Sequence, residues 1–251
     1  MGNKTKMKKE KLLNTCINNI NMDEAIDYIC DCIEKKKIAY IVPINVDMVV
    51  KIEKDEYLKK IVNEADLTLI DGKPLIWISK MYGNQIKEKI SGSDLIPKLC
   101  NVASKKGISI FIIGGAEGVA KKAKENLENE IPGINIVGTY SPSFGFEKKD
   151  DEKRLINSII SDANPDIVIA CFGCPKQEKW VYENYKKYDS IVSICGGATV
   201  DFLAGNVKRA PNWMSESGLE WLYRFFQEPK RLFKRYFIDD LKIFKLIWKY
   251  K

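Results

Sequence analysis

Histidine is absent from the 251-residue chain. This absence excludes Ser-His-Asp and Cys-His catalytic triads, zinc sites built on imidazole, and acid–base catalysis by imidazole. Any proton transfer in this protein must therefore fall to Asp, Glu, Lys, Tyr or Cys.

Long apolar runs are also missing, because none reaches the length of about 18 residues that a membrane-spanning helix needs. The first residues, MGNKTKMKKEKLL, are basic and lack the apolar segment of a secretory signal. Lys6 stands where a myristoylation motif needs Ser or Thr. We therefore expect a cytoplasmic protein whose seven cysteines are free thiols: Cys16, Cys30, Cys32, Cys100, Cys171, Cys174 and Cys195.

The charge is distributed unevenly. Hydrophobic residues make up 45% and charged residues 30% of the chain, which is ordinary for a globular protein. The net charge is +7, and residues 208–251 carry eleven basic against five acidic residues, a net +6. The same segment holds three of the five tryptophans. A tail that is both basic and aromatic favours an anionic, partly apolar surface as its partner.

Helical and strand patterns alternate along most of the chain. Helices are predicted at 23–37, 45–65, 92–107, 116–130, 149–163 and 175–188, and strands at 38–43, 65–71, 108–115, 134–140, 165–173 and 190–197. The strands are continuous apolar runs, which is typical of a parallel sheet covered on both faces. The prediction is a Rossmann-like α/β fold with a mostly parallel sheet. It comprises a catalytic domain at 1–210 and a helical appendage at 211–251.

Polar residues and glycines follow the predicted strands, where open α/β sheets bind their ligands. They are Asn45, Asp71, Gly114, Gly115, Gln177, Gly196 and Gly197. Asp71 fits either a catalytic carboxylate or a helix cap. Gly114-Gly115, with Gly118, fits either a phosphate cradle at a helix N-terminus or a tight turn, and it lacks the full dinucleotide fingerprint. For Cys171-x-x-Cys174 we favour incidental small residues over a redox or zinc site.

The segment Pro229–Tyr250, projected as one helix, has two contrasting sides. One carries an apolar stripe of Phe233, Phe237, Leu241, Phe244 and Trp248, with Tyr236, Ile243 and Ile247 beside it. The other carries Arg231, Lys234, Arg235, Lys242, Lys245 and Lys249. This profile predicts an interfacial helix on an anionic membrane. The alternative is a helix docked on its own domain with a solvated basic side.

Several motifs together resemble the WecG/TagA/CpsF glycosyltransferases. They are INVDMV, the strand that ends in Asp71-Gly72, SGSDL, FGCPKQEKW, and the long run SICGGATVDFLAGNVKRAPNWMSESGLEWLYRFFQEPKRLFKRY. The match covers roughly residues 12–240. The resemblance implies an inverting enzyme that moves a sugar, typically N-acetylmannosamine or its uronic acid, from UDP to undecaprenyl-diphosphate-linked N-acetylglucosamine. The product would enter teichoic acid, common antigen or capsule synthesis.

The resemblance also implies roles for individual residues. Asp71 corresponds to the catalytic base, with Asp94 of SGSDL as the next candidate and a substrate-binding position. Asn45 and Gln177 correspond to polar active-site positions, and Arg224 and Arg231 to arginines that reach a diphosphate. Two residues depart from the family pattern. Pro43 replaces a Thr, and Lys89, which we also expect to bind substrate, replaces an Arg and so loses the bidentate fork.

No Asp-x-Asp pair of the kind that binds a metal with UDP-sugars is present. We therefore expect no metal and no cofactor. The expected partners are a UDP-sugar donor, a lipid-linked acceptor and the anionic inner face of the cell membrane, and no nucleic acid; a homo-oligomer stays open. Three alternatives remain: a nucleotide-dependent sugar oxidoreductase or epimerase, a nucleic-acid-binding module, and the same transferase with another UDP-hexose.

Overall fold

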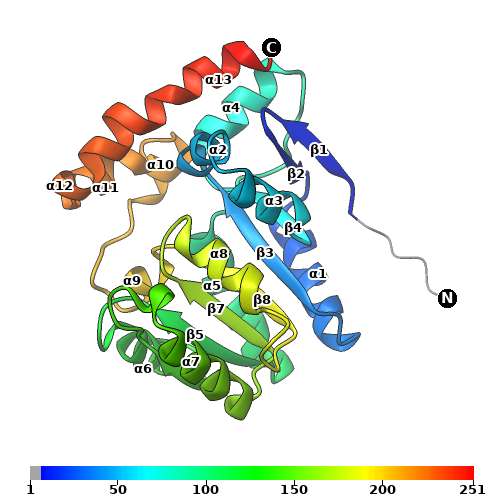
Figure 1. Cartoon of the computed structure of the whole chain (residues 1–251), viewed down its shortest axis with the longest axis vertical. Helices are drawn as coiled ribbons and strands as arrows, with labels where there is room; N and C mark the ends of the chain where they lie inside the picture. The colour runs from blue at the N-terminus through cyan, green and yellow to red at the C-terminus, as the bar shows by residue number, and fades with distance from the viewer. Residues whose placement is uncertain (1–6) are drawn as a thin grey trace.

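A six-stranded parallel sheet forms the centre of the molecule, in the order β4-β3-β8-β7-β5-β6 (Figure 1). The computed structural model describes residues 7–251 apart from the side chain of Asn212, so the expectations for the start of the chain fall largely outside it. The strands are β3 (Ala39–Ile44), β4 (Leu67–Ile70), β5 (Ser109–Gly114), β6 (Asn135–Tyr140), β7 (Ile167–Cys171) and β8 (Val192–Cys195). The predicted parallel α/β sheet is confirmed.

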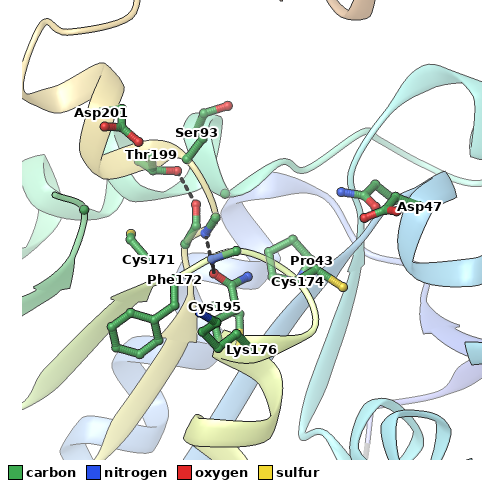
Figure 2. Close-up of a pocket in the computed structure, with 18 of the residues that line it drawn as sticks. Pro43, Asp47, Ser93, Cys171, Phe172, Cys174, Lys176, Cys195, Thr199 and Asp201 are labelled. Atoms are coloured by element: carbon green, nitrogen blue, oxygen red, sulfur yellow. Dashed lines mark hydrogen bonds between the residues drawn. The ribbon is translucent and has the colours of Figure 1, made fainter. Parts of the chain in front are cut away.

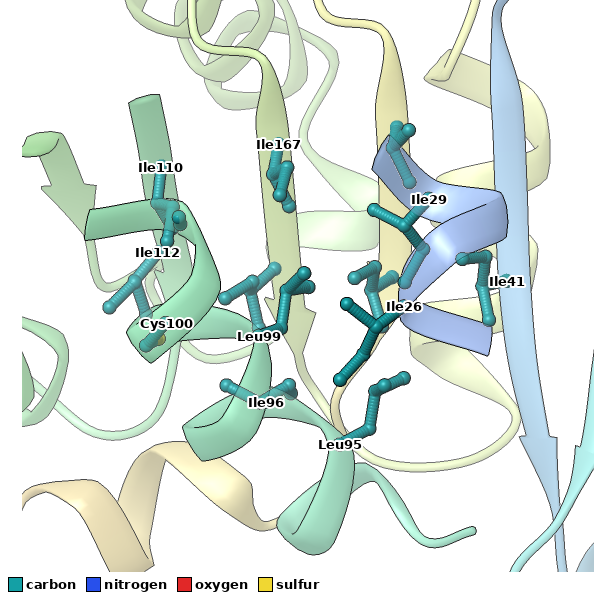
Figure 3. Close-up of a cluster of buried hydrophobic side chains, with 14 of the residues drawn as sticks. Ile26, Ile29, Ile41, Leu95, Ile96, Leu99, Cys100, Ile110, Ile112 and Ile167 are labelled. Carbon is teal, nitrogen blue, oxygen red and sulfur yellow. The ribbon is translucent and has the colours of Figure 1, made fainter. Parts of the chain in front are cut away.

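The sheet has a hydrophobic core on each face, because successive strand residues point to opposite sides. In β5, Ile110 and Ile112 face one core, and Phe111 and Ile113 face the other. The first core, shown in Figure 3, is covered by α1 (Met22–Glu34), α5 (Gly92–Lys106), α6 (Val119–Glu130) and α9 (Thr199–Leu203). The second is covered by α2 (Val46–Ile52), α3 (Glu56–Glu64), α4 (Lys73–Met81), α7 (Asp150–Ala163) and α8 (Lys176–Asn184), with the turn η1 (Phe146–Lys148) beside them.

Several elements differ from the sequence prediction. The single helix predicted at 45–65 is wrong: α2 ends at Ile52 and α3 begins at Glu56. Asp55 caps the new helix, because its carboxylate accepts a hydrogen bond from the Leu58 N–H. Helix α8 is shorter than predicted. A hairpin of β1 (Lys9–Leu12) and β2 (Thr15–Asn18), held to β4 through Thr68, and the helix α4 were not predicted.

The C-terminal tail is helical but irregular, and lies across the carboxyl ends of the strands (Figure 1). It comprises α10 (Asn212–Glu216), α11 (Glu220–Gln227), α12 (Pro229–Lys234), the π-turn η2 (Arg235–Asp239), the 3-10 turn η3 (Asp240–Lys242) and α13 (Ile243–Lys249). The projection of Pro229–Tyr250 as one regular α-helix is therefore wrong, since a π-turn shifts the side-chain register.

One side of the tail docks on the α/β layers and the other is exposed. Ile243 and Leu246 join the second core, and the Tyr82 hydroxyl donates to the Ile247 carbonyl at 2.5 Å. The predicted stripe of Phe233, Phe237, Leu241, Phe244 and Trp248 is exposed, by 42% at Phe237 and 85% at Trp248. No helix in residues 7–251 has the length and apolarity that crossing a bilayer requires.

Candidate active site

A polar cavity of about 620 Å³ opens at the carboxyl ends of the strands (Figure 2). Its floor is made by the residues after β3, β4, β5, β7 and β8, and part of its wall comes from the tail. A second cavity of about 370 Å³ lies between α4 and the tail. The two cavities share five lining residues: Asn45, Asp71, Glu220, Arg224 and Arg235. The strand-end residues thus meet where parallel α/β sheets bind ligands.

Asp71 sits at the junction of the two cavities, directly after β4. Its N–H donates to the Ile44 carbonyl at 2.7 Å, which fixes the loop before α4. Burial, and next the nearby Glu220 carboxylate, raise the pKa of Asp71 to about 6, while Lys89 and Arg224 oppose the rise. A carboxyl group with such a pKa suits proton transfer near neutral pH.

Lys89 and Asp94 are partners of one another. The Lys89 ammonium lies 2.8 Å from the Asp94 carboxylate and 3.6 Å from that of Glu220 in α11. Asp94 also pairs with Arg209, and Ser215 donates to Glu220 at 2.7 Å. Lys89 lines the second cavity, whereas Asp94 lines neither. This network ties the start of α5 to the tail and fixes Glu220 next to Asp71.

Gln177 at the start of α8 joins two strand ends. Its Oε1 accepts hydrogen bonds from the Gly173 N–H at 3.3 Å and the Gly197 N–H at 3.0 Å. Its Nε2 donates at 2.7 Å to the carboxylate of Glu178, whose pKa is raised by burial. Gln177 therefore lines the polar cavity and holds the loops after β7 and β8 together.

The glycines allow close approach of the backbone. A Cβ on Gly114 would lie 2.3 Å from the Cys171 carbonyl oxygen, and one on Gly196 would lie 2.7 Å from Cys171 Sγ. The N–H groups of Gly115 and Gly196 already donate to the carbonyls of Cys171 and Ala170. Gly115, Gly196 and Gly197 line the polar cavity, whereas Gly114 does not. These contacts favour the tight-turn interpretation over the phosphate cradle.

Asn45 and its neighbours in α2 connect β3 to the tail. Asn45 caps α2 by accepting from the Met48 N–H at 3.1 Å. Asp47 is buried and lies 2.7 Å from Lys51 and 3.8 Å from Arg235. In Figure 2, Asp47 lies across the cavity from Thr199 and Asp201. Pro43 lines the same cavity, so the hydroxyl that the family's Thr would place there is missing.

Three arginines of the tail line the polar cavity: Arg224, Arg231 and Arg235. Arg231 is exposed and paired with Glu228. The Nε atoms of Arg224 and Arg235 are buried and make no hydrogen bond with the described residues, although Arg235 Nε lies 3.8 Å from the Asp47 carboxylate and 3.9 Å from that of Asp240. Buried donors of this kind generally find an acceptor. An anionic ligand would supply one.

Sequence reasoning missed Arg235, Asp47 and Glu220. The projection placed Arg235 on the basic side of a regular helix, but the π-turn that begins at Arg235 brings its guanidinium into the cavity. The second carboxylate of the INVDMV motif was a usable signal for Asp47. No local signal identifies Glu220, because its position depends on how the tail docks.

The cysteines behave as packing residues. All seven are free, and burial raises the pKa of Cys171 to about 12 and that of Cys174 well above its usual value. The part of the chain that the structure describes contains no cluster of three or more His, Cys, Asp or Glu side chains arranged to hold a metal. The raised pKa values of both thiols favour packing residues over a reactive pair at Cys171-x-x-Cys174.

Comparisons with known proteins agree with this geometry. A family model described as "Glycosyl transferase WecG/TagA/CpsF family" matches residues 10–251. An N-acetylglucosaminyldiphosphoundecaprenol N-acetyl-beta-D-mannosaminyltransferase of Bacillus subtilis is 32% identical over 226 residues, or 90% of this chain and 86% of the relative. The enzyme of the same name from Bacillus spizizenii is 30% identical over 199 residues, or 79% and 75%. The resemblance predicted from the motifs is confirmed, and the chain belongs to the WecG/TagA/CpsF family of glycosyl transferases.

Proposed function

We propose that this enzyme transfers N-acetylmannosamine from UDP to undecaprenyl-diphosphate-linked N-acetylglucosamine, with inversion at the anomeric carbon. The observation that carries the proposal is the position of Asp71, a carboxyl group with a raised pKa between a polar cavity and a second cavity. The names of both Bacillus relatives support this donor sugar and acceptor. The product is a lipid-linked disaccharide of the teichoic acid type.

In the proposed reaction, Asp71 accepts the proton of the acceptor hydroxyl while the hydroxyl oxygen attacks the anomeric carbon. The bond between that carbon and the donor's phosphate oxygen breaks, and UDP leaves with the bonding electrons. One displacement from the opposite side inverts the configuration. The proton then remains on Asp71 until it passes to solvent.

The leaving diphosphate needs positive charge, and the tail supplies it. Arg224, Arg231 and Arg235 line the polar cavity, and the guanidinium fork matches phosphate oxygens. The N–H groups of Gly115, Gly196 and Gly197 already donate hydrogen bonds inside the protein. We therefore assign to the three arginines the diphosphate binding that the sequence had predicted for the glycines. Asn45 and Gln177 shape the same cavity.

We also propose that the tail holds the enzyme on the cytoplasmic face of the membrane, as an appendage of residues 211–251 on a catalytic domain of residues 1–210. The exposed stripe supports this, because a soluble monomer rarely exposes a contiguous apolar surface of this kind. Lys242 and Lys249, expected to contact lipid, pair instead with Asp239 and Glu53. Lys234 and Lys245 are exposed and remain the best-placed cations for anionic lipid.

A donor screen tests the proposal. Purified enzyme is incubated with N-acetylglucosamine diphosphate on a short lipid chain and with each of several UDP-sugars, and the products are identified by mass spectrometry and NMR. We expect a β-linked N-acetylmannosaminyl product only from the corresponding donor. A different UDP-hexose as sole donor would correct the sugar, and hydride transfer or epimerisation without glycosyl transfer would contradict the proposal.

A further inference from the structure

Glu178 is a buried carboxyl group that the proposed reaction does not use. It follows Gln177 in α8, its exposed fraction is 0%, and it lines the polar cavity. The cation that acts on it is Lys51 of α2. The Lys51 ammonium, however, lies 2.7 Å from the Asp47 carboxylate and donates to the Cys174 carbonyl at 3.0 Å. The positive charge nearest to Glu178 is therefore already paired with another carboxylate.

The surroundings of Glu178 favour the neutral acid. The charged and titratable groups on the elements around it are Lys51 and Asp47 of α2, Cys174 after β7, Cys195 at the end of β8, and Arg235 of the tail. Both thiols keep their protons, because burial raises their pKa values as well. Burying a charge without a partner is costly, so a carboxylate in such a place takes up a proton instead. Burial accordingly raises the pKa of Glu178, and its neighbours oppose the rise only in part.

Gln177 fixes the orientation of this carboxyl group. The Gln177 Oε1 accepts from the N–H groups of Gly173 and Gly197, so the amide cannot flip without losing both hydrogen bonds. Its Nε2 therefore points to Glu178 and donates to the Glu178 Oε1 at 2.7 Å. With Oε1 as the acceptor, the proton of the neutral acid belongs on Oε2.

The Oε2 atom of Glu178 is buried and has no hydrogen-bond partner in the part of the chain that the structure describes. Buried polar groups generally find a partner. Because Glu178 lines the polar cavity, an oxygen atom of a ligand bound there would supply the acceptor. A carboxylic acid that its site keeps neutral can act as such a hydrogen-bond donor.

We propose that Glu178 is a neutral carboxylic acid that donates its Oε2–H to an oxygen atom of the sugar-nucleotide donor in the polar cavity. The inference rests on the proposed function, because the sugar nucleotide is part of it. Phosphate, hydroxyl and carbonyl oxygens all accept such a hydrogen bond, so the acceptor atom belongs either to the nucleotide or to the sugar. Glu178 then binds and orients the donor, and Asp71 remains the base.

The first test is the pH dependence of kcat/KM for the UDP-sugar, from about pH 5 to about pH 10. Glu178 donates only while it is protonated, so the wild-type rate should fall as the pH rises through its raised pKa. In Glu178→Gln an amide N–H replaces the O–H at every pH. We therefore expect this basic limb to disappear, while the acidic limb of Asp71 stays in place.

Two further variants isolate the hydrogen bond. Glu178→Met keeps the length of the side chain and removes both oxygens, so kcat/KM should fall about tenfold, the loss expected for one hydrogen bond. The matched control is Glu183→Gln, the same chemical change on the same helix. Glu183 is exposed, accepts from the Tyr57 hydroxyl and does not line the polar cavity. It should keep both limbs of the wild-type profile.

Infrared difference spectroscopy detects the proton directly and needs no turnover. At neutral pH, the spectrum of the wild type minus that of Glu178→Gln should show the C=O stretch of a protonated carboxyl group. The band should move when a ligand accepts the hydrogen bond. A shift with UDP alone assigns the acceptor oxygen to the nucleotide, and a shift only with UDP-N-acetylmannosamine assigns it to the sugar.

Three results would overturn the inference. If the band is missing, or if it moves with neither ligand, Glu178 is not the hydrogen-bond donor, although the proposed function stands as long as sugar is transferred. If Glu178→Gln keeps the basic limb of the wild type, another group titrates there. If the wild type transfers sugar from no UDP-sugar, the proposed function fails and the assignment of the ligand fails with it.

Discussion

At the residue scale, the reactivity of Asp71 depends on a carboxylate from the tail. Burial and Glu220 raise its pKa to about 6, Asp94 adds a smaller rise, and Lys89 and Arg224 oppose it. A base must be deprotonated, so the rate should fall as the pH drops through this value, by about tenfold between the plateau and pH 5.

Substitution of Glu220 by Gln removes the like charge, so the pKa of Asp71 should fall and the acidic limb of the pH–rate profile should move to lower pH. Glu216→Gln on the exposed side of α10 is the control and should leave the profile in place. The measurement is kcat/KM for the acceptor from about pH 4.5 to about pH 8, a range that brackets the expected pKa of Asp71. An unmoved limb in Glu220→Gln would show that Glu220 does not influence the base.

In the proposed reaction, arginine side chains supply the charge that stabilises UDP, and this has a consequence for the metal requirement. Arg224, Arg231 and Arg235 line the cavity, and the sequence has no Asp-x-Asp pair. We expect the rate to be the same with EDTA as without it. Loss of activity in EDTA and its recovery with Mg²⁺ or Mn²⁺ would contradict this expectation.

At the element scale, the site depends on loops held at fixed separation. The Gln177 Oε1 accepts hydrogen bonds from N–H groups in the loops after β7 and β8, and its Nε2 donates a hydrogen bond to buried Glu178. Gln177→Leu leaves these groups without partners, so we expect a loss of about 1–3 kcal/mol in the free energy of unfolding. Urea denaturation measures it, with Gln85→Leu in an exposed loop as the control. Equal stability of the two variants would contradict the role of Gln177 in joining these loops.

The same elements explain what the sequence could predict. Continuous apolar strands between amphipathic helices determine the parallel sheet, and its carboxyl ends place Asn45, Asp71 and Gln177 together. The sequence pattern did not indicate the helix break at Asp55, because the apolar periodicity continues through it. The sequence also did not indicate the π-turn at Arg235, because it depends on how the tail docks on the α/β layers. The same docking places Glu220 near Asp71.

At the scale of the whole molecule, the tail exposes both the apolar stripe and the cations Lys234 and Lys245. If the tail binds the membrane as proposed, we expect Lys234 and Lys245 each to contribute about 1 kcal/mol near the anionic surface. The double variant Lys234→Glu/Lys245→Glu should therefore sediment far less with anionic liposomes. Lys98→Glu/Lys121→Glu, on α5 and α6, has the same net charge and should bind like the wild type. Equal losses in both variants would mean that net charge, and not this surface, governs binding.

The central claim is that Asp71 is the base of a glycosyl transfer. The most direct measurement is the turnover of Asp71→Asn with UDP-N-acetylmannosamine and a lipid-diphosphate acceptor, together with its affinity for UDP. A positioned base contributes about 10²–10⁴ in rate, so turnover should fall by that factor while the Kd for UDP stays near the wild-type value. Near-normal turnover in a variant that still binds UDP would contradict the account.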